Sequence, residues 1–339
     1  MAGSPKLPNK RPGGALKSKL GSSQGIPKLG PAHPRGLPKH LLWAGSRPSR
    51  NSSSGNLAIQ TEFPIARVVV DGPPPRDALL AEELLLAALD RGWPEGTRSK
   101  FLITPGGFML APWPDSWRGQ TGWGSQPQDL APLKDAAEKE LWRALTPRVL
   151  ELAARRTQVL SVSVDLFGGT TFAEPHAELV ALIDVVRRRV VGWTGKSYPV
   201  AGQARGLVQE SNLGSHLIEV ADEKVLVLGC HDLNMFSARA YANQASGSPR
   251  RMRTMDMLER TRKFRPTLVI QHPHLTDSPR IWSTAWGSLK RSLPSVKAWA
   301  SGICFYRGGR KERAKLDAVL AGTRSTQEDV LDILVRTHR

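Results

Sequence analysis

From Phe63 onward the chain alternates short apolar runs with segments of helical periodicity, and this alternation limits the possible folds more than any other feature. The apolar runs predict strands at Ile65–Val70, Phe101–Ile103, Val159–Phe167, Leu179–Val185, Val190–Trp193, His216–Val220, Val225–Leu228, Thr267–Gln271 and Trp299–Tyr306. Helices are predicted at Asp77–Asp90, Leu133–Arg156 with a break at Pro147, Met255–Phe264 and Ile281–Leu293, and two more at the end of the chain, the last opened by Ser325 and Glu328 in capping-box spacing. Such an alternation predicts a single α/β domain over residues 61–339.

Residues 1–60 differ from the rest of the chain in composition and in charge. They hold ten Lys or Arg and no acidic residue, with eight Pro and nine Gly, and so carry over half of the net charge of +18. A segment with so few large apolar side chains cannot bury enough surface to offset its chain entropy, so we expect a disordered tail. Its basic charge favours nucleic acid or an acidic partner, and the alternative is a solvated tail without a partner.

The cysteine content and the hydropathy of the chain limit its class. Two cysteines in 339 residues are typical of a reducing compartment, and neither has zinc-finger spacing. No uncharged apolar run reaches the roughly 18–20 residues of a membrane span, and the N-terminus lacks the apolar region of a secretory signal. We therefore expect a cytoplasmic protein that contacts no membrane and needs no cofactor.

The segment from Lys224 to Phe236 gives the strongest indication of chemistry. A hydrophobic strand ends in Gly229 and Cys230 and turns at once into polar residues, which places the thiol at the carboxyl edge of a sheet, where open α/β sheets bind their ligands. A thiol at that edge is a candidate nucleophile, and a following backbone N–H could stabilise an oxyanion. The alternative is a buried structural cysteine, which is the interpretation that fits Cys304 inside its apolar strand.

Lys196 is the candidate partner of this thiol. It follows a predicted strand and Gly195, 34 residues before Cys230. An ammonium group in a site can hold the negative charge that develops when a nucleophile attacks. Taken alone, Lys196 would be an ordinary solvated lysine, so its candidacy depends on the cysteine.

The order of these elements resembles the nitrilase, or carbon–nitrogen hydrolase, superfamily over roughly Phe63 to Tyr306. The resemblance lies in the strand that ends at Pro105, in the strand that leads to Lys196, and in the strand followed by Cys230-His-Asp232. It implies an αββα sandwich that forms homo-oligomers and cleaves amide, carbamoyl or nitrile groups of small molecules through a Cys acyl-enzyme. It also implies that Cys230 is the nucleophile and Lys196 the catalytic lysine, with Glu210 as a further glutamate.

One position departs from the family pattern. The general-base glutamate of the family directly follows the proline at the end of the second strand, and here Gly106 and Gly107 follow Pro105. Glycine cannot accept a proton, so the base comes from elsewhere, with Glu210, His231 and Glu174 as substitutes, or the chain is a non-catalytic member that binds a partner. The neighbouring side chains of Cys230 and His231 are expected to point in opposite directions at a strand end.

Two further groups of residues are expected near the thiol. In the resembling fold, the loop Gln271–Asp277 follows the strand next to the cysteine strand, so the resemblance implies that His272 or His274 lines the same pocket. With His231 and Asp232 they form an alternative site for a hydrolytic metal. The segment from Thr104 to Pro127 is predicted as a pocket-forming loop in which Trp113, Trp117 and Trp123 form an aromatic wall or an oligomer contact. The residues expected to contact substrate are thus His231, His272, Trp113 and Gly106.

Overall fold

The computed structural model describes residues 61–75, 77–117, 129–169, 174–199, 203, 205–237, 244–276, 278–305 and 314–337. The basic segment 1–60 lies outside these residues, so its predicted disorder and its predicted partners stay predictions. Trp123, Asp277 and Tyr306 also lie outside them.

The larger of two sheets has eight strands, and it presents the segments that later converge on one site. Its main path runs β11-β1-β2-β4-β5-β6, with β12 paired to β1 and β3 paired to β4. The strands are β1 (Thr61–Asp71), β2 (Thr97–Ile103), β3 (Met109–Pro112), β4 (Thr157–Phe167), β5 (His176–Asp184), β6 (Arg189–Gly195), β11 (Ile303–Cys304) and β12 (Val330–Arg336). β1, β2 and β4 are parallel, whereas β5 and β6 return antiparallel.

The smaller sheet has four strands in the order β10-β9-β8-β7. These are β7 (Leu217–Val220), β8 (Glu223–Leu228), β9 (Leu268–Gln271) and β10 (Ala298–Ser301). β8, β9 and β10 are parallel, so their carboxyl ends meet at one edge of the sheet. That edge holds both the segment after β8, which begins with Gly229, and the segment after β9, which begins with His272.

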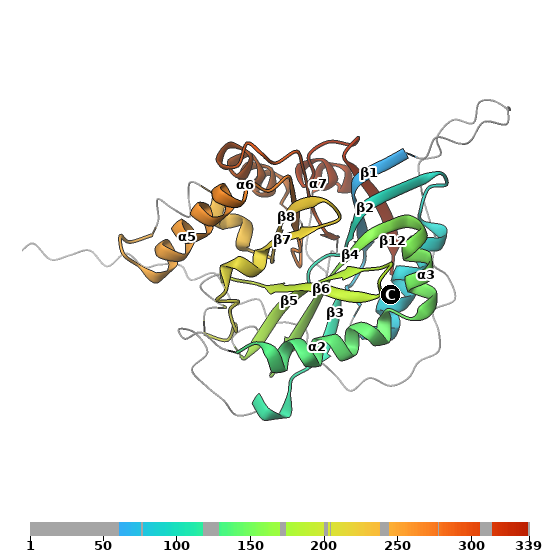
Figure 1. Cartoon of the computed structure of the whole chain (residues 1–339), viewed down its shortest axis with the longest axis horizontal. Helices are drawn as coiled ribbons and strands as arrows, with labels where there is room; N and C mark the ends of the chain where they lie inside the picture. The colour runs from blue at the N-terminus through green and yellow to red at the C-terminus, as the bar shows by residue number, and fades with distance from the viewer. Residues whose placement is uncertain are drawn as a thin grey trace, which may run out of the picture.

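The two sheets pack face to face and helices cover both outer faces, which gives an αββα sandwich (Figure 1). Side chains of both sheets form the inner core, among them Val225 and Val227 of β8, while their neighbours Leu226 and Leu228 face the outer helices. The outer helices of the larger sheet are α1 (Ala78–Leu86), α2 (Ala131–Ala144) and α3 (Pro147–Arg156), and those of the smaller sheet are α5 (Pro249–Phe264) and α6 (Pro279–Ser292). The predicted fold class is confirmed.

Local signals account for the helix limits. The Asp77 carboxylate accepts a hydrogen bond from Leu80 N at 2.8 Å and so caps α1, and a π-helical turn (Ala87–Arg91) extends it to Gly92. Pro147 separates α2 from α3, as its fixed φ and missing N–H predict.

Three predictions of local structure are wrong. The predicted last helix is strand β12, which pairs with β1 from Ile65 to Asp71, while α7 (Leu316–Gly322) precedes it. Pairing along a whole neighbouring strand outweighs the capping-box spacing, which is a local signal. The predicted strand Trp299–Tyr306 is divided at Gly302 into β10 and β11, which belong to different sheets. The predicted loop after Pro105 contains a strand, β3, because that segment pairs with β4.

Within the described residues, the search for a helix long and apolar enough to cross a membrane finds none.

Candidate functional site

Strand ends and strand interiors of the two sheets place four polar side chains around Cys230. Cys230 follows β8 and His274 follows the adjacent β9. In the larger sheet, Asp165 lies on β4 and Glu178 lies directly opposite it on β5, and Lys196 immediately follows β6. A Cβ on Gly229 would lie 3.0 Å from Lys196 Cα, so only glycine allows the cysteine and lysine segments to approach this closely.

The thiol of Cys230 is buried and held in a cationic environment. The residue is 6% exposed, its Sγ lies 3.5 Å from the backbone N–H of His274, and its carbonyl oxygen accepts a hydrogen bond from Gln271 Nε2 at 2.9 Å. Burial alone would raise the pKa of the thiol, but the charges of His231, His274 and Lys196 hold that pKa well below its usual value. The neighbouring cations therefore favour the thiolate form of Cys230 over the thiol.

Lys196 is almost completely buried and is fixed by two acceptors. Its Nζ donates to Glu178 Oε1 at 2.7 Å and to Gln203 Oε1 at 2.6 Å. Burial would lower the pKa of this lysine, yet the nearby negative charges of Glu178 and Cys230 raise it. In return the ammonium group, with His274, lowers the pKa of Glu178 to about 2 despite its burial. Lysine and glutamate thus form a charged pair inside the protein.

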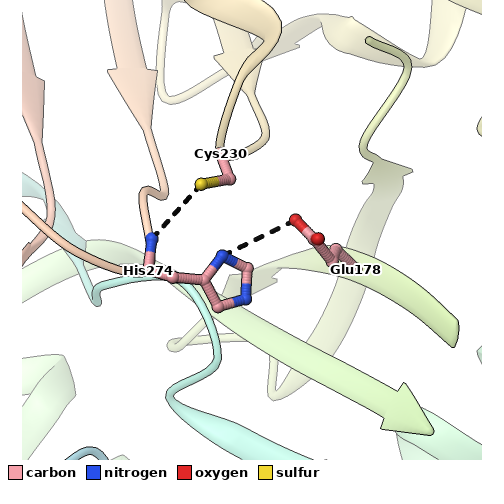
Figure 2. A group of neighbouring side chains, drawn as sticks. All are labelled: Glu178, Cys230 and His274. Atoms are coloured by element: carbon pink, nitrogen blue, oxygen red, sulfur yellow. Dashed lines mark hydrogen bonds and ion pairs between the residues drawn. The ribbon is translucent and has the colours of Figure 1, made fainter. Parts of the chain in front are cut away.

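His274 connects the two carboxylates that face each other across β4 and β5. Its Nε2 lies 2.6 Å from Asp165 Oδ2, and its Nδ1 lies 3.6 Å from Glu178 Oε2. Burial would lower the pKa of His274, but Asp165, Glu178 and the Cys230 thiolate hold it well above its usual value. Figure 2 shows the imidazole facing the Glu178 carboxylate, while the thiol is directed at the backbone nitrogen of His274. One donor atom from each of these three residues lies within 4.8 Å of the other two, so they are also a candidate set of metal ligands.

Gly106 is the position at which the resemblance predicts a general base. A Cβ there would lie 2.9 Å from Pro273 C and 3.0 Å from His274 N, and closer still to His272 O. The backbone N–H of Gly106 donates to Pro273 O at 3.0 Å. The space that a glutamate would need is thus filled by the loop that carries His274.

The structure does not bring the Glu210 carboxylate to the thiol or to the ammonium group of Lys196 in any contact between described residues. Its oxygens accept from Asn212 N at 2.9 Å and from Lys134 Nζ at 3.3 Å. Asp232 has a structural role, because its carboxylate accepts the backbone N–H groups of Ser197, Tyr198 and Gly229. It therefore orders the lysine and cysteine segments and is not available to the metal site that its spacing predicted.

The other predicted residues lie in different surroundings. His272 is buried between the sheets with Nε2 2.9 Å from Ser161 Oγ, and burial lowers its pKa to about 3. His231 begins a 3₁₀ turn (Asp232–Phe236), and its charge acts on the thiol. Trp113 is 7% exposed, packs over Gly168 and belongs with Trp117 to the outer core of the larger sheet. Core packing thus accounts for both tryptophans.

Sequence reasoning missed Asp165, Glu178 and Gln203. A signal for the first two is present, because each is an acidic residue within a strand whose other residues are mostly apolar. A carboxylate in such a strand is buried, and buried carboxylates need a cationic or hydrogen-bonding partner. Gln203 lies in a turn and carries no comparable signal.

Comparisons with known proteins give structural likenesses only. No family model matches the chain, and no curated protein matches it by sequence. An amidase from Nesterenkonia sp. is 16% identical over 74% of this chain and 79% of its own, with a TM-score of 0.43. A mutant of the Nesterenkonia AN1 amidase, described as from the nitrilase superfamily, is 15% identical over 73% of this chain and 79% of its own, with a TM-score of 0.45.

Nit3 of Saccharomyces cerevisiae, a member of branch 10 of the nitrilase superfamily, is 10% identical over 74% of this chain and 78% of its own, with a TM-score of 0.43. At these identities the likeness concerns the fold alone. The TM-scores are all below 0.5, so these likenesses carry no argument about activity, and the chemistry has to be argued from the side chains of this chain.

Proposed function

We propose that the chain cleaves a carbon–nitrogen bond in an amide, carbamoyl or nitrile group of a small molecule, with Cys230 as nucleophile. The observation that supports this proposal best is the buried thiol whose pKa is lowered by neighbouring cations, beside a lysine fixed by a glutamate. A structural cysteine has no need of such surroundings, whereas a nucleophile has to be a thiolate.

In the first step the Cys230 thiolate attacks the carbonyl carbon. A C–S bond forms and an electron pair moves to the carbonyl oxygen, which becomes an oxyanion. The ammonium group of Lys196 stabilises this charge, and because Glu178 and Gln203 already fix the ammonium group, little reorganisation is needed as the charge develops.

Proton transfer is assigned to His274. As an imidazolium it donates a proton to the leaving nitrogen, the C–N bond breaks, and an amine and a thioester result. Water then attacks the thioester, the neutral imidazole accepts the proton of that water, and the acid leaves as the thiolate returns. Asp165 positions His274 and favours its charged form. In this proposal His274 carries out the proton transfers that the resemblance would assign to a glutamate at position 106.

Two further properties accompany the proposal. Neither Cys230 nor Cys304 forms a disulfide bond, which fits a reducing, cytoplasmic setting. Three exposed apolar side chains on α5 and α6, Met252, Met255 and Ile281, support self-association through these helices. A homo-oligomer is therefore the expected assembly.

The test is turnover of a panel of small amides, ureas and nitriles, followed as release of ammonia. Wild-type protein and Cys304→Ala are expected to turn over the same members of the panel, and Cys230→Ala none of them. Mass spectrometry of acid-quenched reactions should show the acyl group on the Cys230 peptide alone. Turnover that survives in Cys230→Ala, or an acyl group found elsewhere, would falsify the assignment.

A further inference from the structure

The Glu178, Cys230 and His274 side chains have the composition and spacing of a metal site. Thiolate, imidazole and carboxylate are the three ligand types of zinc, and three protein ligands with one open position are typical of zinc sites that exchange ligands. In a tetrahedral site with bonds of about 2.1 Å, two oxygen or nitrogen ligands lie roughly 3.4 Å apart. The 3.6 Å between His274 Nδ1 and Glu178 Oε2 is close to that separation and too long for a good hydrogen bond.

The atoms that surround these ligands agree with a metal site. Glu178 Oε2 is buried and accepts no hydrogen bond from any described residue, whereas Oε1 is paired with Lys196. The carboxylate can therefore bind a cation through one oxygen and keep its lysine through the other. His274 has its Nε2 against the Asp165 carboxylate, which is the arrangement by which metal-binding histidines are oriented.

The charges of the cluster also favour a divalent cation. Carboxylate and thiolate are anionic ligands and imidazole is a neutral one, so Glu178, Cys230 and His274 together would offset the two charges of a Zn²⁺ ion.

We propose that Glu178 Oε2, Cys230 Sγ and His274 Nδ1 bind a zinc ion, with Asp165 as the residue that orients the imidazole. All three donor atoms lie within 4.8 Å of one another, so side-chain adjustments of roughly 1 Å bring them to bonding distances. Binding occupies the thiolate and the imidazole, so zinc and substrate compete for Cys230. This inhibitory consequence rests on the proposed function, whereas the binding itself does not.

The test uses Co²⁺ as a spectroscopic substitute for Zn²⁺ on the full chain, reduced and freed of metal. A cobalt–thiolate charge-transfer band should appear in the wild type and in Cys304→Ser, should be absent in Cys230→Ser, and should be displaced by Zn²⁺. In Asp165→Asn, which retains all three ligands, the apparent affinity should fall by about 10–100-fold. Circular dichroism verifies that each variant is folded. Histidines elsewhere in the chain that bind Co²⁺ give no thiolate band.

The outcomes separate the two proposals. No thiolate band in the wild type at millimolar Co²⁺, or a band that remains in Cys230→Ser, overturns the zinc site whatever the hydrolase assay gives. A cobalt–thiolate band without turnover of any amide, urea or nitrile supports the zinc site and contradicts the hydrolase proposal. If both are present, zinc should inhibit turnover and a chelator should restore it.

Discussion

Asp165 and Glu178 lie directly opposite one another on the antiparallel strands β4 and β5, and the imidazole of His274 lies between their carboxylates and the Cys230 thiol. Two like charges in that cross-strand position destabilise a sheet unless a cation offsets them. Here the cations are Lys196 and His274. The two carboxylates, which alone would disfavour this strand register, therefore bind the two cationic groups that lower the pKa of the Cys230 thiol.

This relationship predicts how Asp165→Asn changes the reactivity of Cys230. The substitution removes the charge that favours the imidazolium, so the pKa of His274 falls and the thiol loses a neighbouring cation at neutral pH. The pKa of Cys230 should therefore rise by about one unit or more. The measurement is the pH dependence of Cys230 alkylation by iodoacetamide, followed on its own peptide so that Cys304 does not interfere.

Asp184→Asn is the matched control, because Asp184 accepts from Arg187 at the far end of β5. Its alkylation profile should coincide with that of the wild type. If the Asp165→Asn alkylation profile coincides with those of the wild type and Asp184→Asn, His274 does not set the pKa of the Cys230 thiol.

Gly106 gives a second prediction, which concerns sterics rather than charge. A single methyl group at this position collides with the backbone of the His272–His274 loop, so Gly106→Ala should displace His274. Overpacking of this kind costs about 1–3 kcal/mol of unfolding free energy. We expect that loss in urea unfolding, together with slower alkylation of Cys230.

The same substitution at Gly287 is the control. Gly287 lies within α6, and a Cβ there meets only the end of the flexible Arg291 side chain at 3.6 Å. Because alanine favours helix over glycine, Gly287→Ala should stabilise the protein by about 0.5–1 kcal/mol and leave alkylation unchanged. If Gly106→Ala is as stable as the wild type and its Cys230 is alkylated at the same rate, the His272–His274 loop accommodates the methyl group without destabilising the fold.

The placement of Cys230 and Lys196 could be predicted from sequence because each follows an apolar strand that local pattern identifies. His274 could be predicted to lie nearby because parallel neighbouring strands end at the same edge. The first argument needs only local pattern, whereas the second also needs the strand order that the resemblance implies. The local apolar pattern also predicted most of the strands and the helices up to α6.

The role of Glu178 could not be predicted, because it depends on the register of β4 against β5 and on the contact between two sheets. The filling of the Gly106 position depends on a loop more than 160 residues away in sequence, so local pattern could not predict that the His272–His274 loop occupies this space. The prediction of a helix in place of β12 was wrong for a similar reason. The capping-box spacing of Ser325 and Glu328 is a local signal, whereas the pairing partner β1 lies at the other end of the domain.

The buried Glu178–Lys196 pair predicts how stability depends on pH. The folded-state pKa of Glu178 is lowered to about 2, below its unfolded value, so its contribution is present above about pH 4.5 and is lost as the pH falls toward 2. At about 1.4 kcal/mol for each unit, the contribution at pH 7 is about 3 kcal/mol. Glu178→Gln should thus be less stable than the wild type by that amount at pH 7.

The difference between the two proteins should approach zero near pH 2, as followed by urea unfolding between pH 2 and 7. Subtracting one curve from the other removes the contributions of the remaining carboxylates. Glu151→Gln removes a carboxylate whose ion pair with Arg155 is exposed, so it should change stability by no more than about 0.5 kcal/mol at any pH. A Glu178→Gln difference that stays constant with pH would contradict the lowered pKa.

Arg67 on β1 anchors the C-terminal strand β12 to its neighbour in the larger sheet, which gives the last prediction. Its buried guanidinium donates to Asp332 Oδ1 on β12 at 2.5 Å, to Ser301 O at the end of β10, and to Leu320 O and Thr323 near the end of α7. Arg67→Met leaves three buried carbonyl oxygens and a carboxylate without this donor. We expect a loss of about 3–5 kcal/mol in unfolding free energy and early exchange of the β12 amides.

Arg260→Met is the control for this substitution, because Arg260 pairs with Asp256 on the exposed face of α5 at 2.7 Å. That exposed pair should contribute no more than about 0.5 kcal/mol. If Arg67→Met and Arg260→Met lower the free energy of unfolding by the same amount, the Arg67 guanidinium does not stabilise the position of β12. Amide hydrogen exchange of β12 in Arg67→Met then tests whether its hydrogen bonds to β1 are sufficient to hold the strand. If they are, the β12 amides remain protected in this variant.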